Sequence, residues 1–333
     1  MSGKLILVTG ATGFIAGQII DHALEAGYRV RGTVQTAKLD KLKAVTVPGL
    51  EFVEVNDIVT ADLTDVLNGI DIVIHVAAPL PSKATVEDSL KIAMEGPLNV
   101  VRQAEKFGIT KIIVTSTFGA LMDPSLVPAF TGNTFKDSDW GATSKEEILD
   151  RDTDIFYCYF GGKNLGERAL WNFAREHPHL DITTILPGFV YGPYSKNLPK
   201  PSSLAEMGTN TFPYMVANGL IPPFGPPFVV DGRDVGRAHV NAIDLPPSSN
   251  IGSKRFIVNA GNYSWKELAA HLQKTRPELD VPPQEAFADF PGPLSTLDGS
   301  KAQQVLGIKE YISPVKTMED IIDDLEYTKA WTA

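Results

Sequence analysis

The sequence predicts an α/β protein: a Rossmann-type, doubly wound parallel sheet with a smaller C-terminal α/β region that binds substrate. Two observations carry this prediction. Short apolar runs alternate with amphipathic helical segments through the first two-thirds of the chain, as is typical of strands buried on both faces of a parallel sheet. Glycines also stand where the first run meets the first helical segment, as in folds that bind a dinucleotide.

The first predicted strand is the continuous apolar run at residues 5–8. Similar runs lie at 30–34 (interrupted by Gly32), 52–55, 72–74, 112–114 and 182–186. Helical periodicity lies between them, at residues 14–25, 86–107 and 155–175. Repeated strand–helix–strand units favour right-handed crossovers, which place the strands parallel in one sheet.

The alternation of strands and helices stops after residue 186, because eleven of the 24 prolines lie between residues 187 and 247. Proline lacks the backbone donor that regular elements need, so we expect loops here with one helix near 202–218. Further helices are expected at 234–243, 264–276 and 318–329. The predicted division is a dinucleotide-binding domain over 1–190, to which 220–245 returns, and a substrate-binding region over 191–333.

Composition and charge exclude several classes of protein. Of the 333 residues, 43% are hydrophobic and 21% charged, which is ordinary for a globular protein and excludes disorder. The formal net charge of −10 argues against nucleic acid or an anionic membrane as partner. The single cysteine, Cys158, forms no internal disulfide, and no apolar run reaches the ~20 residues that span a bilayer. We expect a cytoplasmic monomer or homodimer with a small-molecule substrate.

The segment after the first strand predicts a phosphate-binding loop with the spacing Gly10-x-x-Gly13-x-x-Ala16. Glycines at a strand-to-helix turn let the backbone approach a pyrophosphate, which the helix N-terminus attracts with its free N–H groups. The residues expected to bind a dinucleotide here are Gly10, Thr12, Gly13, Phe14 and Ile15.

The end of the second strand predicts which dinucleotide is bound. A carboxylate there would bind the 2′-hydroxyl of NAD, whereas basic residues accommodate the 2′-phosphate of NADP. No carboxylate stands at this strand end, and Gln35 and Lys38 are able to hydrogen-bond a phosphate. NADP is therefore favoured over NAD, while a solvated helix face explains any single lysine equally well. Later strand ends add the expected cofactor contacts Asp57, Ile58, Ala77, Ala78, Pro79 and Thr115.

Tyr159 and Lys163 predict acid–base chemistry, because residues four apart in the predicted helix share a face. A nearby ammonium favours the phenolate and so lowers the tyrosine pKa toward the range of an acid–base catalyst. Gly161 and Gly162 between them indicate that the helix backbone lies close to a cofactor. A packed tyrosine with a surface lysine is the alternative. A hydroxyl at the end of the fifth strand would bind a substrate carbonyl oxygen, or merely cap the strand.

Together these motifs resemble those of the extended short-chain dehydrogenases/reductases, in the NAD-dependent epimerase/dehydratase superfamily. The sequence is most similar to the dihydroflavonol reductase-like and methylglyoxal reductase-like ketoreductases, over nearly its full length. The resemblance rests on the Gly10 loop, Thr115-Ser116-Thr117, Tyr159 to Lys163, residues 187–193 and Arg233-Asp234-Val235. It implies hydride transfer between NADPH and a ketone or aldehyde.

The resemblance also implies roles for single residues. Tyr159 would donate the proton, Lys163 would tune the pKa of Tyr159 and bind the cofactor ribose, and Thr117 would be the catalytic hydroxyl, with Ser116 as second candidate. The nicotinamide would be lined by Pro187, Gly188, Phe189 and Val190.

Two other functions are open at this stage. A sugar-nucleotide epimerase or dehydratase would use the same scaffold, but dehydratases of that group place an acid directly after a threonine, where Ser116 follows Thr115. A dinucleotide-sensing regulator typically lacks the tyrosine that this chain keeps. The sequence departs from the family pattern at Gln35, where NADPH-dependent members usually carry arginine, and at Gly162, where serine is common.

Aromatic and apolar residues after the sixth strand favour an apolar carbonyl substrate, although each fits plain core packing as well. The residues assigned to the substrate pocket are Phe118, Tyr191, Tyr194 and Met215. The proline between His177 and His179 breaks helical geometry, and no carboxylate or thiol cluster accompanies the pair, so we expect a surface loop and no metal. His75 lies in a buried strand and is expected to be a satisfied core residue.

Overall fold

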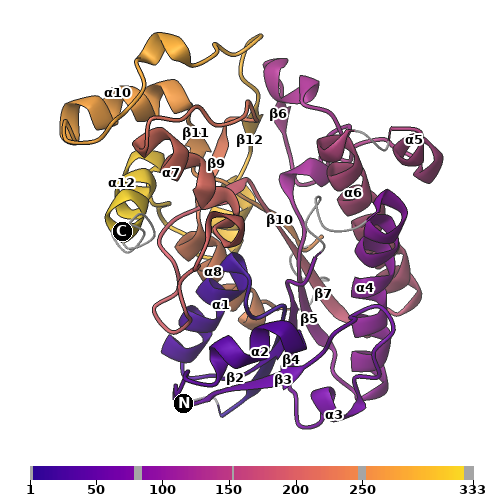
Figure 1. Cartoon of the computed structure of the whole chain (residues 1–333). Coiled ribbons are helices and arrows are strands. Elements are labelled where there is room, and N and C mark those ends of the chain that lie inside the picture. Colours follow the sequence, from indigo (N-terminus) through magenta and orange to yellow (C-terminus); the bar gives the residue numbers. More distant parts are fainter. Residues whose placement is uncertain (1–2, 79–84, 152–153, 247–252, 326–333) are drawn as a thin grey trace.

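The structure, a computed structural model, describes residues 3–78, 85–151, 154–246 and 253–325, except for the side chain of Ile155. Among them, seven parallel strands form one sheet in the order β10-β7-β5-β4-β1-β2-β3 (Figure 1). These strands are β1 (Leu5–Thr9), β2 (Arg29–Val34), β3 (Leu50–Glu54), β4 (Ile72–His75), β5 (Lys111–Thr115), β7 (Asp181–Pro187) and β10 (Arg255–Val258). The predicted Rossmann-type sheet is confirmed.

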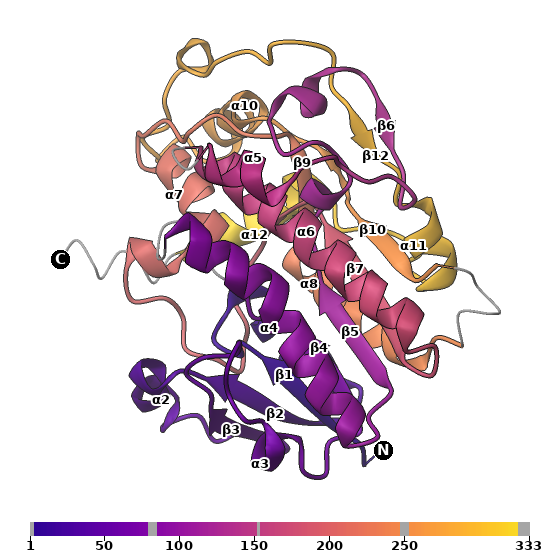
Figure 2. The same ribbon diagram turned by 90° about the vertical axis from the view of Figure 1, so that its right-hand side faces the viewer.

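Helices cover both faces of this sheet. They are α1 (Phe14–Glu25), α2 (Thr36–Leu42), α3 (Thr64–Leu67), α4 (Val86–Lys106), α6 (Ile155–Glu176), α8 (Gly232–Asn241) and α11 (Ser300–Val305). Side chains of a strand alternate between the two faces, so Ile6 and Val8 join one buried cluster with Ile19 of α1, and Leu7 joins another with Val100 of α4. α1 packs on α8, and α4 packs along α6 (Figure 2).

The C-terminal part adds a smaller α/β region with its own buried cluster. Its main sheet joins β8 (Phe189–Tyr191), β9 (Phe228–Asp231) and β11 (Gly261–Asn262). The helices around it are α7 (Thr211–Ala217), α10 (Trp265–Thr275) and α12 (Pro314–Asp324). A two-stranded sheet and a short helix complete the fold, with bounds β6 (Thr134–Phe135), β12 (Thr296–Leu297) and α5 (Lys145–Leu149). Figure 1 shows this region above the large sheet.

Two of the predicted helices differ from their expected bounds by more than two residues. The single helix expected at 202–218 is wrong: two 3-10 turns precede α7, because Gly208 takes the left-handed φ of 62° and interrupts the helix. α12 begins earlier than expected, since Ser313 caps it through Lys316 N and Pro314 occupies its first turn. No helix in the described ranges combines the length and hydropathy that crossing a bilayer requires.

The carboxyl ends of the central strands lie side by side. Thr9 at the end of β1 pairs with His75 of β4, and Thr115 of β5 pairs with Ile185 of β7. Ligands of open parallel sheets bind outside these ends. The strand ends singled out in the sequence therefore converge on one edge.

Candidate active site

The loop between β1 and α1 has the backbone geometry of an anion site. Gly10 has the left-handed φ of 68°, and a Cβ there would lie 3.0 Å from Cα of Ala77. Gly13 precedes α1, and neither a capping side chain nor a first-turn acid is present at this helix end. Its first N–H groups can therefore bind an anion. A dinucleotide pyrophosphate fits this cradle, whose backbone a side chain at Gly10 would strain against Ala77.

The other residues predicted around this loop have partners within the chain. Thr12 accepts a hydrogen bond from Nζ of Lys38 at 3.1 Å. Phe14 packs edge-on against Tyr194, with 5.5 Å between ring centroids, and Ile15 packs against the core beneath α1. Lys38, in the first turn of α2, therefore lies between the end of β2 and the glycine loop.

The predicted 2′-phosphate site contains two residues that sequence reasoning missed. Gln35 Nε2 donates to the Asn56 carbonyl at 3.3 Å, and the Asn56 side chain accepts from the backbone N–H of Thr36 at 2.9 Å. Glu54 accepts from the Thr36 hydroxyl at 2.5 Å. Glu54 stands opposite Val34 in the β2–β3 register. The pairing of β3 with β2 was therefore the signal that could have placed Glu54 at this site. A carboxylate therefore lies near this site, although it comes from β3 rather than β2.

The segment between residues 28 and 50 holds several basic side chains, and most of them form ion pairs. Arg31 pairs with Glu51 and Lys41 with Glu206, each at 2.6 Å, and Lys43 pairs with Asp40 at 2.6 Å. The lysine of this segment that bonds the glycine loop is Lys38.

The predicted contacts at later strand ends are only partly brought together. Asp57 accepts from the Thr60 hydroxyl at 2.5 Å and from the N–H of Val59 at 2.9 Å, and these bonds lower its pKa. Ile58 packs toward α4, since a Cβ on Gly96 would lie 3.3 Å from it. Ala77 lies against the glycine loop and Ala78 is exposed. Pro79 lies outside the described residues.

Tyr159 and Lys163 lie near the start of α6, one turn apart. Asp154 caps this helix by accepting from Tyr157 N at 2.9 Å. Burial raises the pKa of Tyr159 to about 12 and lowers the pKa of Lys163 to about 8, against the opposing charge of Glu167. The expected lowering of the tyrosine pKa is therefore not found in the protein alone, because burial dominates. Lys163 Nζ donates to the Thr115 carbonyl at 3.3 Å.

Two of the three hydroxyls at the end of β5, those of Thr115 and Ser116, are engaged by other side chains. Ser116 Oγ donates to Glu167 at 2.7 Å, in a buried contact. Thr115 Oγ1 lies 2.8 Å from Nε2 of His239, whose pKa burial lowers to about 4. This neutral ring donates through Nδ1 to the Val235 carbonyl at 2.8 Å, so Nε2 accepts from Thr115.

Thr117 is differently placed from its two neighbours. Its oxygen accepts from Gly119 N at 3.3 Å, and its hydroxyl hydrogen has no acceptor within the described part of the chain. Thr117 is therefore the hydroxyl of this strand end that can still donate to a ligand, and it stays the predicted catalytic one.

The glycines between Tyr159 and Lys163 serve helix packing, which corrects the expectation that they approach a cofactor. A Cβ on Gly161 would lie 2.6 Å from Ile148 of α5, and one on Gly162 would lie 3.4 Å from Leu90 of α4. Gly166 approaches the Ala93 carbonyl more closely still. Small residues let α6 lie directly on its neighbours, which places Tyr159 and Lys163 at the sheet edge.

His75 is only half satisfied. The Thr9 hydroxyl oxygen accepts from the N–H groups of Val76 and Ala77, so it donates its own hydrogen to Nδ1 of His75 at 2.8 Å. Burial, together with the charge of Lys163, lowers the His75 pKa to about 3, so the neutral ring carries its hydrogen on Nε2. That nitrogen has no partner among the described residues.

The segment after β7 connects the sheet edge to a cavity. Gly188 N donates to the Val258 carbonyl at 3.1 Å, and a side chain there would collide with Asn259. Pro187 ends β7 and Val190 is buried. Phe189 faces the cavity, as does Phe156, which stands one turn before Tyr159 on α6.

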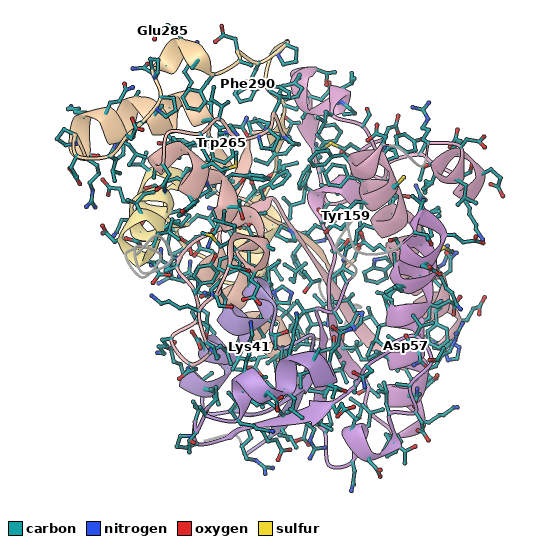
Figure 3. The ribbon with its side chains drawn as sticks, viewed as in Figure 1. Lys41, Asp57, Tyr159, Trp265, Glu285 and Phe290 are labelled. Carbon is teal, nitrogen blue, oxygen red and sulfur yellow. The ribbon has the colours of Figure 1, made fainter. Side chains whose placement is uncertain are left out.

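The cavity measures about 260 Å³, and its wall is mainly aromatic and apolar. Residues that line it include Phe156, Phe189, Tyr191, Phe212, Trp265 and Phe290. Figure 3 shows Tyr159 on the side of α6 nearest the region that carries Trp265 and Phe290. The wall therefore suits an apolar ligand. Tyr159 is not among the lining residues, but Phe156, one turn earlier on α6, is.

Of the four residues predicted for a substrate pocket, Tyr191 lines this cavity. Phe118 is buried below it and packs on Phe228, with 5.1 Å between ring centroids. Tyr194 donates its hydroxyl to the Met207 carbonyl at 3.0 Å, and Met215 lies on α7. Aromatic composition alone did not distinguish wall from core.

The fold and the glycine loop are those of a dinucleotide-binding α/β protein. The model of the NAD dependent epimerase/dehydratase family matches residues 6–212, so the chain belongs to that family. It is 32% identical to an anthocyanidin reductase of Vitis vinifera, over 98% of this chain and 96% of that protein. It is 29% identical to the ketoreductase azaE of Aspergillus niger, over 92% and 93% of the two chains.

A solved structure agrees with these sequence relatives. Gre2 of Candida albicans in complex with NADPH has a TM-score of 0.77 and 26% identity, and the match covers 97% of this chain and 98% of that one. These matches confirm the resemblance inferred from the motifs. The relatives named here are oxidoreductases, the class that the motifs predicted.

Proposed function

We propose that this protein is an NADP(H)-dependent carbonyl reductase, which transfers hydride between NADPH and a ketone or aldehyde and runs in reverse as an alcohol dehydrogenase. One set of positions supports the proposal: Lys163 bonds the end of β5, the unengaged Thr117 hydroxyl follows that strand, and Tyr159 stands one helical turn from Lys163. The ketoreductase and Gre2 relatives support it. The aromatic cavity wall supports an apolar substrate over a sugar nucleotide.

The side chains divide the acid–base work. NADPH, when bound, supplies the hydride. Tyr159, with its pKa near 12, is a phenol at neutral pH and donates its proton to the carbonyl oxygen as negative charge develops there. Thr117 donates a hydrogen bond to the same oxygen. Lys163 keeps a positive charge beside Tyr159 at neutral pH, which stabilises the phenolate left behind.

The test is a spectrophotometric assay of the purified protein with NADPH and separately with NADH, against aldehydes, diketones, aryl ketones and keto esters. We expect oxidation of NADPH, fastest with an apolar aryl or branched ketone. Binding of NADPH without turnover on any carbonyl would favour a regulator. Turnover of a UDP- or dTDP-sugar would favour an epimerase.

Removing the Lys38 cation tests the choice of cofactor. For Lys38→Ala we expect the KM for NADPH to rise about 10-fold, which corresponds to one charged hydrogen bond at a partly solvated site, and the KM for NADH to stay unchanged. Lys43→Ala is the matched control, since this lysine is 71% exposed and pairs with Asp40. Equal effects of Lys38→Ala on both cofactors would contradict a 2′-phosphate contact.

The pH dependence of reduction should report Lys163 rather than Tyr159. Burial lowers the pKa of Lys163 to about 8, so this side chain loses its charge as the pH rises through that value, while Tyr159 stays protonated. The value of kcat/KM, which reports the free enzyme, should therefore fall above about pH 8. Lys163→Arg should move this fall to higher pH. A fall confined to the region near pH 12 would contradict the assignment.

A further inference from the structure

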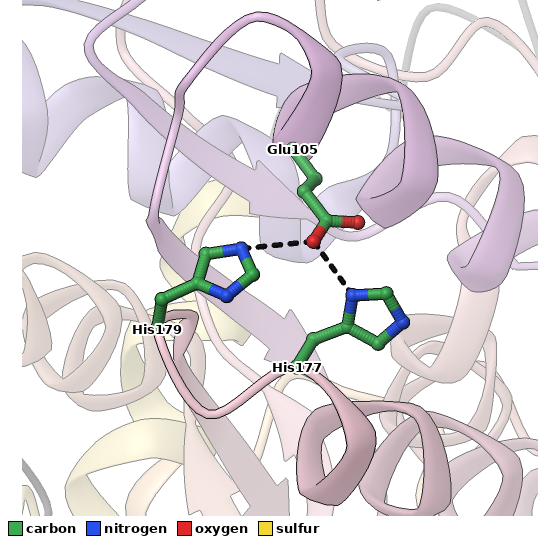
Figure 4. A group of neighbouring side chains, drawn as sticks. All are labelled: Glu105, His177 and His179. Carbon is green, nitrogen blue, oxygen red and sulfur yellow. Dashed lines mark hydrogen bonds and ion pairs between the residues drawn. The ribbon is translucent and has the colours of Figure 1, made fainter.

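A carboxylate joins the His177-Pro178-His179 segment, although it stands 72 positions away in the sequence. Glu105 Oε1 lies 2.6 Å from Nδ1 of His177 and 2.8 Å from Nε2 of His179 (Figure 4). One ligand atom from each residue lies within 4.8 Å of the others. The expectation of no metal here rested on the helix-breaking proline and on the lack of a carboxylate or thiol cluster. The packing of α4 along α6 brings Glu105 to both histidines.

The two histidines are held in place by the protein. Residues 177–180 form a turn closed by the bond from Leu180 N to the His177 carbonyl at 3.0 Å, with Pro178 in the position that fixes its backbone. The His177 ring stacks on Phe173 with 3.9 Å between centroids and 14° between planes. Leu180 anchors the turn in the core. The His177 imidazole therefore loses little freedom on binding a ligand, and the turn fixes the backbone that carries His179.

The local field also favours a cation. Glu105 is in the last turn of α4, and His177 is the residue that ends α6. Both helices thus direct their negative ends toward the cluster. The nearby Arg102 is paired with Glu95 at 3.1 Å. The side chains are 23%, 31% and 57% exposed for Glu105, His177 and His179, so an ion could enter from solvent and keep water on its remaining positions.

We propose that Glu105, His177 and His179 bind one divalent transition-metal ion of the zinc class. Two imidazoles and a carboxylate are a donor set that Zn²⁺, Ni²⁺ and Co²⁺ accept, whereas Mg²⁺ and Ca²⁺ prefer oxygen ligands alone. The ion links the carboxyl ends of α4 and α6. Tyr159 lies 18 residues before His177 on α6, about 27 Å along the helix, so the ion stabilises the fold and takes no part in the reaction.

The test is a competition titration of the untagged full chain with Zn²⁺ against a chromophoric chelator. We expect one ion bound per chain, and a zinc affinity at least about 10-fold lower in each of Glu105→Gln, His177→Gln and His179→Gln, because even outer-shell changes cost that much. His271→Gln is the matched control, since His271 contacts the single carboxylate of Glu319 at 2.8 Å without a second histidine. Its affinity should equal that of the unchanged protein.

Melting temperature separates binding from folding. Zn²⁺ should raise the melting temperature of the unchanged protein, because it binds only the folded chain, and should not raise that of His179→Gln. The latter alters an exposed side chain and should melt normally in EDTA. NADPH oxidation should not change with Zn²⁺, so this outcome is independent of the proposed function. The proposal is overturned if the unchanged protein binds no more tightly than His179→Gln, or if His271→Gln loses as much.

Discussion

Replacing Tyr159 with phenylalanine is expected to lower kcat for NADPH-dependent carbonyl reduction by about 10²–10⁴-fold, the usual contribution of a positioned acid. The substitution removes the proton that the carbonyl oxygen must receive and leaves the aromatic ring in place. The ring packs against Phe160, with 5.6 Å between centroids, so the fold should persist. Steady-state kinetics at neutral pH measure the loss, and quenching of protein fluorescence by NADPH checks that the cofactor still binds.

Tyr157 provides the matched control on the same helix. It is buried, and its hydroxyl lies 3.4 Å from that of Thr143. Two positions along a helix turn a side chain by about 200°, so Tyr157 points away from Tyr159. Tyr157→Phe should keep kcat within about twofold, since the hydroxyl contact that it removes lies outside the site. Retention of full turnover by Tyr159→Phe would refute the proposed mechanism, and loss of NADPH binding would show that the tyrosine acts on the cofactor instead.

Local patterns carried most of the fold prediction. The helix expected at 14–25 is found with those bounds, and the six predicted strands all lie in the large sheet. These elements could be predicted because apolar periodicity is a property of neighbouring residues. β10 was missed because it is short and begins with Arg255. Burial of an arginine there depends on distant partners, among them Glu167 of α6, 88 positions away, which accepts two hydrogen bonds from Arg255.

The residues of the candidate site likewise divide into those that local patterns predicted and those that depend on distant contacts. Tyr159 and Lys163 were found because a four-residue spacing is local, and the glycine loop because it follows a strand. The capture of Ser116 by Glu167 and of Thr115 by His239 depends on contacts between distant segments, which no spacing reveals. The tyrosine pKa was predicted in the wrong direction because burial is set by the whole fold.

Beneath the site, Glu167 and Arg255 form a buried ion pair. Both side chains are at most 3% exposed, and two bonds join them, at 2.9 Å and 3.2 Å. Glu167 also accepts from Ser116 at 2.7 Å and Thr184 at 2.8 Å. The Arg255 guanidinium stacks over Trp140 at 3.6 Å. The pair therefore links β10, α6 and the end of β5 behind the catalytic groups.

Breaking this pair from one side should destabilise the protein strongly. Glu167→Gln keeps the size of the side chain but leaves the Arg255 charge buried without its carboxylate, and such changes cost about 3–5 kcal/mol. The free energy of unfolding, from urea titration at neutral pH, measures the loss. Glu51→Gln is the matched control, since Glu51 pairs with Arg31 but is 56% exposed, and exposed pairs contribute about 0–1 kcal/mol.

A double variant separates the cost of an unpaired charge from the worth of the pair. Glu167→Leu with Arg255→Met removes both charges, so it should unfold at a higher urea concentration than Glu167→Gln, although it removes more polar contacts. A loss below about 1 kcal/mol in Glu167→Gln would contradict the argument, as would a double variant no more stable than the single one. Glu167 also opposes the lowering of the Lys163 pKa. The alkaline fall in kcat/KM should therefore move to lower pH in Glu167→Gln, an effect that destabilisation alone does not produce.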